Sequence, residues 1–147
     1  MSADGKNTFG KEEHLCKQTL IEQLFGGSAK ATTAWPIRMV CLLVDKKDER
    51  EASLQVLVSV SKRYFKRAVK RNRVKRQIRE AFRHHKQELE VEMEQRAGKQ
   101  LLVAFIWQTD QLLASAKIEP KMKKLIHSLV QNLADKQQEH SHAENGL

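Results

Sequence analysis

The chain has 147 residues, of which 40% are hydrophobic, and its 27 Lys and Arg outnumber its 18 Asp and Glu to give a net charge of +9. This length and apolar fraction suffice for one domain with its own core, and no apolar run approaches the ~20 residues that a membrane-spanning helix needs. Two cysteines cannot form a disulfide framework, and the polar N-terminus is not a secretory signal. We therefore expect a cytoplasmic protein that does not bind membranes.

Composition divides the chain into three segments. Residues 1–10 are polar, contain two glycines and are expected to be flexible, residues 11–135 are expected to form the domain, and residues 136–147 a polar tail. Apolar residues recur at helical spacing over residues 11–25, and Gly26-Gly27 ends that predicted helix because glycine readily adopts the left-handed conformation. Residues 28–34 are expected to be a loop.

Two predicted strands follow. Residues 37–44 are an apolar run with β-branched residues, which is typical of a strand, and the charged residues 45–50 are typical of a turn. In residues 52–60 large apolar and small polar residues alternate, so the period of two predicts a second strand with unlike faces. The apolar face, expected against helices, carries Leu54, Val56, Val58 and Val60. The other face, expected to be open, carries Ser53, Gln55, Leu57 and Ser59.

A long helix is predicted over residues 68–95, with its buried stripe at Val74, Ile78, Ala81, Phe82, His85, Leu89 and Met93. His85 is interpreted as a core histidine. At about 100° per residue, one polar arc beside the stripe is almost entirely cationic. It carries Asn72, Lys75, Arg76, Arg79, Arg83 and Lys86. Glutamates dominate the C-terminal part of this helix.

The last two predicted elements are a strand and a helix. Residues 101–107 are apolar on both faces, which predicts an interior strand after Gly98. An amphipathic helix follows over residues 112–133, with Pro120 in its first turn. Its inward residues are Ile118, Met122, Leu125, Ile126, Leu129 and Leu133.

The position of the positive charge indicates the function. Twelve of the 27 basic residues lie between Lys62 and Lys86, where Glu80 is the only acid, whereas the rest of the chain is slightly acidic. A solvated helix face normally mixes both signs in i,i+4 pairs. One concentrated basic stretch instead favours a polyanionic partner, and arginine suits bidentate contacts to phosphate.

The residues in this stretch resemble a known signature. The segment Arg71-Asn72-Arg73-x-Lys75-Arg76-x-x-Arg79-Glu80, preceded by Val58-Ser59-Val60-Ser61-Lys62-Arg63 and Ala68-Val69, is similar to the protein subunit of bacterial ribonuclease P. The resemblance covers about residues 11–133. It implies an α+β fold, a single-domain α/β sandwich with a mixed sheet in the order α-β-β-crossover-α-β-α. This fold is like that of the second domain of ribosomal protein S5, and its crossover is left-handed, against the usual rule.

The resemblance also implies the partners and their sites. The protein would bind one catalytic RNA, and the RNA-binding residues would be Lys62, Arg63, Arg67, Arg71, Asn72, Arg73, Lys75, Arg76 and Arg79. The 5′ leader of precursor tRNA would lie in a cleft between the first helix and the sheet, at Ile21, Phe25, Cys41, Ser59 and Ser61. RNA with bound Mg²⁺ would remove the leader, with no catalytic side chain, no protein-held metal and no obligate protein partner.

The chain departs from the family pattern at three places, one of which is the extension of residues 136–147 beyond the family core. The connection Tyr64-Phe65-Lys66-Arg67 is one residue longer than usual and lacks glycine. The family usually has aromatic residues in the leader cleft, near the positions of Ile21 and Cys41, so Phe25 or Tyr64 would have to stack on the bases here.

Three other functions share some of these features. A structural RNA-binding protein of the ribosomal type would share the charge but not the signature. A DNA-binding regulator would place the basic helix in a major groove, but neither a helix-turn-helix nor a dimer is indicated. A protein-only nuclease would need a catalytic constellation, and no metal-site spacing or Ser–His–Asp or Cys–His arrangement is evident.

Overall fold

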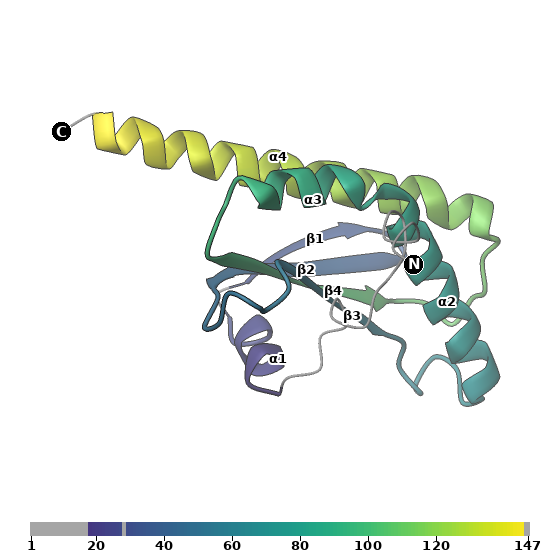
Figure 1. The fold of residues 1–147 in the computed structure, drawn as a ribbon. Helices are drawn as coiled ribbons and strands as arrows, with labels where there is room; N and C mark the ends of the chain where they lie inside the picture. Colours follow the sequence, from purple (N-terminus) through teal and green to yellow (C-terminus); the bar gives the residue numbers. More distant parts are fainter. Residues whose placement is uncertain (1–17, 28, 146–147) are drawn as a thin grey trace, which may run out of the picture.

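The computed structural model describes residues 18–27 and 29–145, with side chains through Asp135. A four-stranded sheet carries α1 on one face and α2, α3 and α4 on the other (Figure 1). In chain order the elements are α1 (Gln18–Leu24), β1 (Lys30–Ala34), β2 (Ile37–Asp45), β3 (Leu54–Ser59), α2 (Ala68–His85), α3 (Gln87–Glu94), β4 (Lys99–Trp107) and α4 (Ser115–Asn145).

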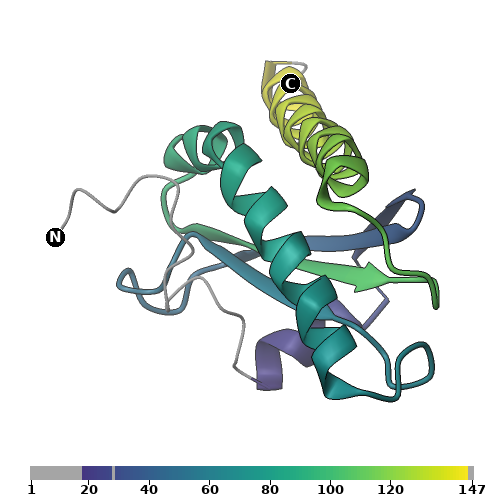
Figure 2. The same ribbon diagram turned by 90° about the vertical axis from the view of Figure 1, so that its right-hand side faces the viewer.

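The sheet is mixed, in the spatial order β1-β2-β4-β3. β1 and β4 both pair with β2 in antiparallel fashion, whereas β3 and β4 are parallel neighbours. Because β3 and β4 are parallel, the chain must return over one face of the sheet to the level where β3 began before it can form β4. It returns through α2 and α3, and this crossover connection is left-handed (Figures 1 and 2). The predicted α+β fold is confirmed, with one strand more than predicted.

The additional strand is β1, in the segment predicted to be a loop. It pairs with β2 from Lys30 opposite Cys41 to Ala34 opposite Ile37. Its residues are mostly polar and exposed, so no apolar alternation marked it in the sequence. As an edge strand it has one bonded neighbour, and β2 supplies the pairing partner that its β-branched Thr32 and Thr33 favour.

The predicted long helix is two helices, because the helix is interrupted at Lys86 between α2 and α3. α3 runs alongside α4, while α2 leaves at an angle (Figure 1). The change of direction lets Leu89 and Met93 join the core below α4. Lys86, predicted on the cationic face, is 1% exposed, with its ammonium 3.8 Å from a carboxylate oxygen of Glu90, so that placement was wrong.

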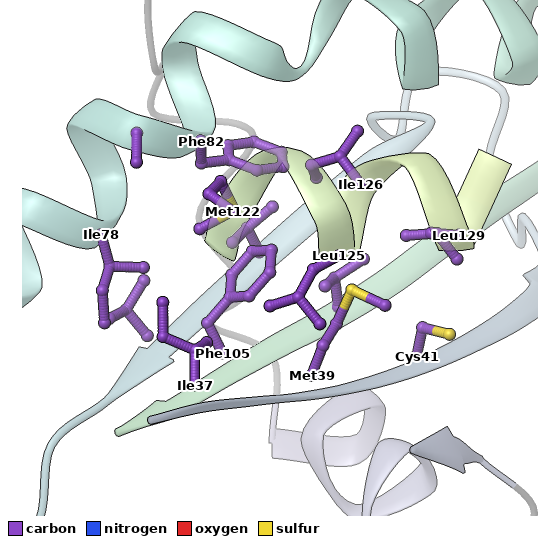
Figure 3. Close-up of a cluster of buried hydrophobic side chains, with 14 of the residues drawn as sticks. Ile37, Met39, Cys41, Ile78, Phe82, Phe105, Met122, Leu125, Ile126 and Leu129 are labelled. Carbon is purple, nitrogen blue, oxygen red and sulfur yellow. The ribbon is translucent and has the colours of Figure 1, made fainter. Parts of the chain in front are cut away.

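The main core lies between the sheet and the α2–α3–α4 layer. The Phe82 ring packs on Phe105 with centroids 5.6 Å apart, and both rings are fully buried (Figure 3). The predicted α2 and α3 stripe is buried except for His85, which is half-buried. The inward residues predicted for α4 are all buried. Periodicity therefore identified this core correctly.

α4 begins at Ser115 and its backbone is helical to Asn145, through most of the segment predicted to be a tail. Pro120 is the sixth residue of the helix, so its predicted place in the first turn was wrong. None of the helices in the described ranges is long and apolar enough to cross a bilayer.

A second, smaller core lies between α1 and the sheet. Leu20 and Leu24 of α1 pack on Val40, Leu102 and Ala104. The face of β3 predicted to be open belongs largely to this core, because Leu57 packs against it. Gln55 is buried there as well, and its Nε2 donates to Gln100 Oε1 at 2.7 Å. The predicted open face is thus closed in its middle, and its polar ends, Ser53 and Ser59, are half-buried.

Candidate nucleic-acid interface

A tight turn connects the end of β3 to the basic helix α2. The Ser61 carbonyl accepts the N–H groups of Tyr64 at 3.1 Å and Phe65 at 3.3 Å, and the Ser61 hydroxyl accepts the N–H of Arg63 at 3.0 Å. Phe65 is buried in the main core and anchors the turn. Ser61, predicted to line the leader cleft, is therefore a residue of this turn, with its side chain bonded locally.

Arg71 secures the turn to the helix. Its Nη1 donates to the carbonyl oxygens of Phe65 at 2.8 Å and Lys66 at 2.9 Å, and the side chain is half-buried. Of the predicted RNA-binding residues, Arg71 is thus the one whose guanidinium also holds the backbone. This contact shapes the longer connection that the sequence alone left undefined.

The N-terminus of α2 is built to receive anions. Arg67 occupies the N-cap with extended backbone, no side chain in the described ranges caps the first turn, and that turn contains no acid. Free N–H groups and the positive end of the helix dipole therefore face outward among basic side chains. This arrangement costs helix stability, and a bound anion would offset that cost.

The outer side of α2 presents the predicted cations. In Figure 2 α2 crosses the front of the molecule, and none of the other described elements lies over it. Asn72, Arg73 and Arg76 are exposed, and Lys75 and Arg79 are half-buried. Among the residues whose side chains are described, no carboxylate pairs with any of these four cations. Lys62, Arg63 and Arg67 are exposed in the adjoining connection.

Acidic groups begin where the cationic face ends. Glu80 forms an ion pair with Arg83, and the hydrogen bond from that guanidinium lowers the pKa of Glu80. Glu119 of α4 contacts both His84 Nδ1 and His85 Nε2 at 3.1 Å. Arg83, predicted on the cationic arc, is therefore compensated, and the histidines join α2 to α4.

A hollow lies beside α1. Phe25, 49% exposed, follows the last turn of α1, and Gly27, with φ of 99°, turns the chain back toward the sheet. A cavity of about 170 Å³ opens there, lined by Leu24, Phe25, Gly27, Ala29, Arg38, Val40 and Ile106. Ile21 packs at the edge of the smaller core. Of the residues predicted for the leader cleft, Phe25 thus lines this cavity, whereas Ile21 lies in the core beside it.

One row of residues crosses the sheet at this cleft. Thr33 pairs with Arg38, Arg38 with Ile106, and Ile106 with Ser59, so all four share one level of the sheet. Arg38 alternates with Val40 and so lies on the α1 face, where it is exposed. The sequence reasoning missed Arg38, although a cation alternating with apolar residues in a strand was a detectable signal.

The same alternation along β2 places Cys41, which was predicted to line the cleft, on the opposite face of the sheet. Cys41 lies on the α4 face, buried near Leu129 (Figure 3). Tyr64 also packs against the main core. Of the two aromatic substitutes considered for the cleft, only Phe25 is located there.

No group of three or more His, Cys, Asp or Glu within residues 18–27 and 29–135 is placed to hold a metal ion. The α+β fold and the cations on the outer side of α2 define a nucleic-acid-binding class of protein, in which a sheet supports a cationic helix.

Comparison with known proteins gives the family. The profile of the family Ribonuclease P matches residues 9–130. The ribonuclease P protein component of Porphyromonas gingivalis (strain ATCC 33277) is 38% identical over 128 residues, which cover 86% of this chain and 90% of the relative. That of Stutzerimonas stutzeri is 37% identical over 81 residues, 55% of this chain and 58% of the relative. The chain belongs to the ribonuclease P protein family.

Solved structures agree on the fold. The RNase P protein of Staphylococcus aureus superposes with a TM-score of 0.57 at 18% identity, covering 80% of this chain and 94% of that one. The protein from Thermotoga maritima gives 0.56 at 16% identity, covering 78% and 94%. The predicted resemblance is confirmed, and with it an RNA partner and a role as a subunit in tRNA 5′ maturation.

Proposed function

We propose that this protein, as the single protein subunit of a cytoplasmic ribonuclease P, binds the catalytic RNA through α2 and the 5′ leader of precursor tRNA through the α1 cleft. One observation carries the proposal: four cations of α2, among them the exposed Arg73 and Arg76, form no ion pair with a carboxylate whose side chain is described. Phosphate groups of a folded RNA supply the missing negative charge.

The two surfaces have different tasks. The α2 face supplies many cations and few groups that read bases, which suits docking on the backbone of a structured RNA. The α1 cleft combines an exposed aromatic ring, Phe25, with one cation, Arg38, and a half-buried hydroxyl, Ser59. Stacking on an aromatic ring together with a basic contact suits single-stranded RNA.

The protein supplies electrostatics and positioning. RNA and substrate hold the Mg²⁺ ions that activate water for cleavage, and the protein lowers the Mg²⁺ concentration that folding and substrate binding require by neutralising phosphates. Its effect is therefore expected to be greatest at low Mg²⁺.

The test is cleavage of a 5′-extended precursor tRNA at low Mg²⁺ by a bacterial ribonuclease P RNA, with and without the protein. We expect site-specific cleavage that depends on the protein and weakens with the Arg73→Ala/Arg76→Ala variant. Tight RNA binding without stimulation of a cognate RNA would indicate a structural RNA-binding protein instead. Cleavage by the protein alone would place the active site in the protein and refute the proposal.

A further inference from the structure

A groove of about 640 Å³ lies between α2 and the start of α4. It exceeds the α1 cavity several-fold and is within the size range of small-ligand sites. Its lining residues are Val69, Arg73, Arg76, Gln77, Glu80 and Ser115. The two arginines of the cationic face thus form one side of a concave site as well as an open surface.

The floor of the groove is held in place by Gln77. Its Nε2 donates to the Leu113 carbonyl at 2.9 Å and to the Ser115 hydroxyl at 3.1 Å, so it joins α2 to the residues that begin α4. Its Oε1 is buried and has no donor among the described residues. Because that oxygen is shielded from solvent, Gln77 positions the floor of the groove but does not present an acceptor to a ligand there.

The walls offer three different chemistries. Val69 is 78% exposed, an apolar side chain on an otherwise charged helix. Arg73 and Arg76 are exposed cations without a carboxylate partner in the described ranges. Glu80 contributes an ionised carboxylate, since Arg83 lowers its pKa, and Arg83 and His84 both contact Oε1. Glu80 thus adds an anionic acceptor to the lining of the groove.

A nucleotide has a group that suits each of these three kinds of side chain, the apolar one, the cationic ones and the carboxylate. A base has an apolar face for Val69 and for a guanidinium plane, and its phosphate suits the arginines. The Glu80 carboxylate in the groove lining selects for a base edge rich in donors. Guanine carries adjacent N1–H and N2–H₂ donors for one carboxylate, and its N7 and O6 accept from arginine. Uracil has one such donor, and adenine and cytosine each present one amino group.

We propose that the groove binds one unpaired guanosine of the RNA that docks on α2. This inference rests on the proposed function, because it requires RNA on the cationic face, but it adds a base-specific contact to binding that is otherwise made through the backbone. Unpaired RNA nucleotides can leave the stack and enter a protein pocket, whereas bases in an A-form helix cannot be read this way.

The test uses four fluorescent RNA hairpins that differ only in one unpaired nucleotide, G, A, C or U, titrated with the full-length protein at fixed salt. We expect the G hairpin to bind about tenfold tighter, within the range for one bidentate base contact. Glu80→Gln should abolish this preference without weakening binding of the other hairpins, because it removes a negative charge. Glu88→Gln, the same change on α3, is the matched control and should retain the preference.

The outcomes separate the two proposals. Equal binding of all four hairpins by the unaltered protein, or a preference for G that persists in Glu80→Gln, would overturn the guanosine site and leave the proposed function intact. No binding of any hairpin, together with no stimulation of precursor cleavage, would overturn both.

Discussion

Removing two cations from the centre of the α2 face tests the docking surface most directly. Arg73 and Arg76 are exposed on one side of α2, make no ion pair with a described carboxylate, and are not in the buried stripe. Arg73→Ala/Arg76→Ala should therefore leave the free energy of unfolding nearly unchanged, because exposed substitutions away from caps and cores usually have small effects. Its effect on RNA binding should be large.

The magnitude follows from counterion release. If six cations of this face contact phosphates, log K falls with log salt at a slope of about −5.4, so affinity drops on the order of 10³-fold between 50 and 200 mM salt. Two fewer contacts leave a slope of about −3.6 and a drop on the order of 10²-fold. The variant should thus differ in salt dependence as well as in affinity.

The assay is fluorescence anisotropy with a labelled ribonuclease P RNA over a salt series at constant Mg²⁺. Lys47→Ala/Arg50→Ala is the matched control, because it also removes two positive charges, but from the turn between β2 and β3 at the far end of the sheet (Figure 1). An unchanged slope in the α2 variant would show that Arg73 and Arg76 contact no phosphates. An equal change in the control would show that net charge rather than the α2 face determines binding.

Three further predictions concern the core, the cleft and the acidic edge of α2. Phe82→Ala removes a fully buried ring from its packing on Phe105, so urea unfolding should show a loss of about 3–5 kcal/mol, and a loss below about 1 kcal/mol would contradict the packing. Phe25→Ala should weaken binding of a leader-bearing precursor by about 1–3 kcal/mol per stacked base while binding of mature tRNA stays the same; equal weakening of both would remove Phe25 from the leader site. Because the hydrogen bond from Arg83 lowers the pKa of Glu80 below 4.5 in the folded protein, the ionised carboxylate stabilises the fold above about pH 4.5, and this stabilisation is lost as the pH falls through the lowered value. Thermal melts of Glu80→Gln should accordingly show a smaller loss of stability in acid than the unaltered protein, and identical acid profiles would argue against the ion pair.

The elements with strong periodicity could be predicted from the sequence. β2 and β4 are nearly continuous apolar runs, because helices cover both faces of the sheet at these strands. The buried stripe of α2 and the inward face of α4 repeat apolar residues about every 3.6 positions, because each helix buries one face. The location of the positive charge and the signature around Asn72 are also properties of the order of residues alone. These two features were sufficient to indicate the family and an RNA partner.

What the sequence could not show depends on residues distant along the chain. β1 is a strand because β2 offers it a partner, and its own polar residues carry no signal. Lys86 is buried because the helix turns there toward α4, a contact that helical periodicity does not contain. Only the sheet register places Arg38 on the α1 face and Cys41 on the opposite face, since neighbouring residues of a strand point to opposite sides.

The groove likewise arises from tertiary structure. Gln77 and Ser115 are far apart in the sequence, and their hydrogen bond brings the start of α4 beside Arg73 and Arg76. Local sequence thus determined which helix is cationic, because charge and periodicity are local properties. Packing of α4 against α2 determined that this helix also borders a concave site, because a cavity exists only between elements that the fold brings together.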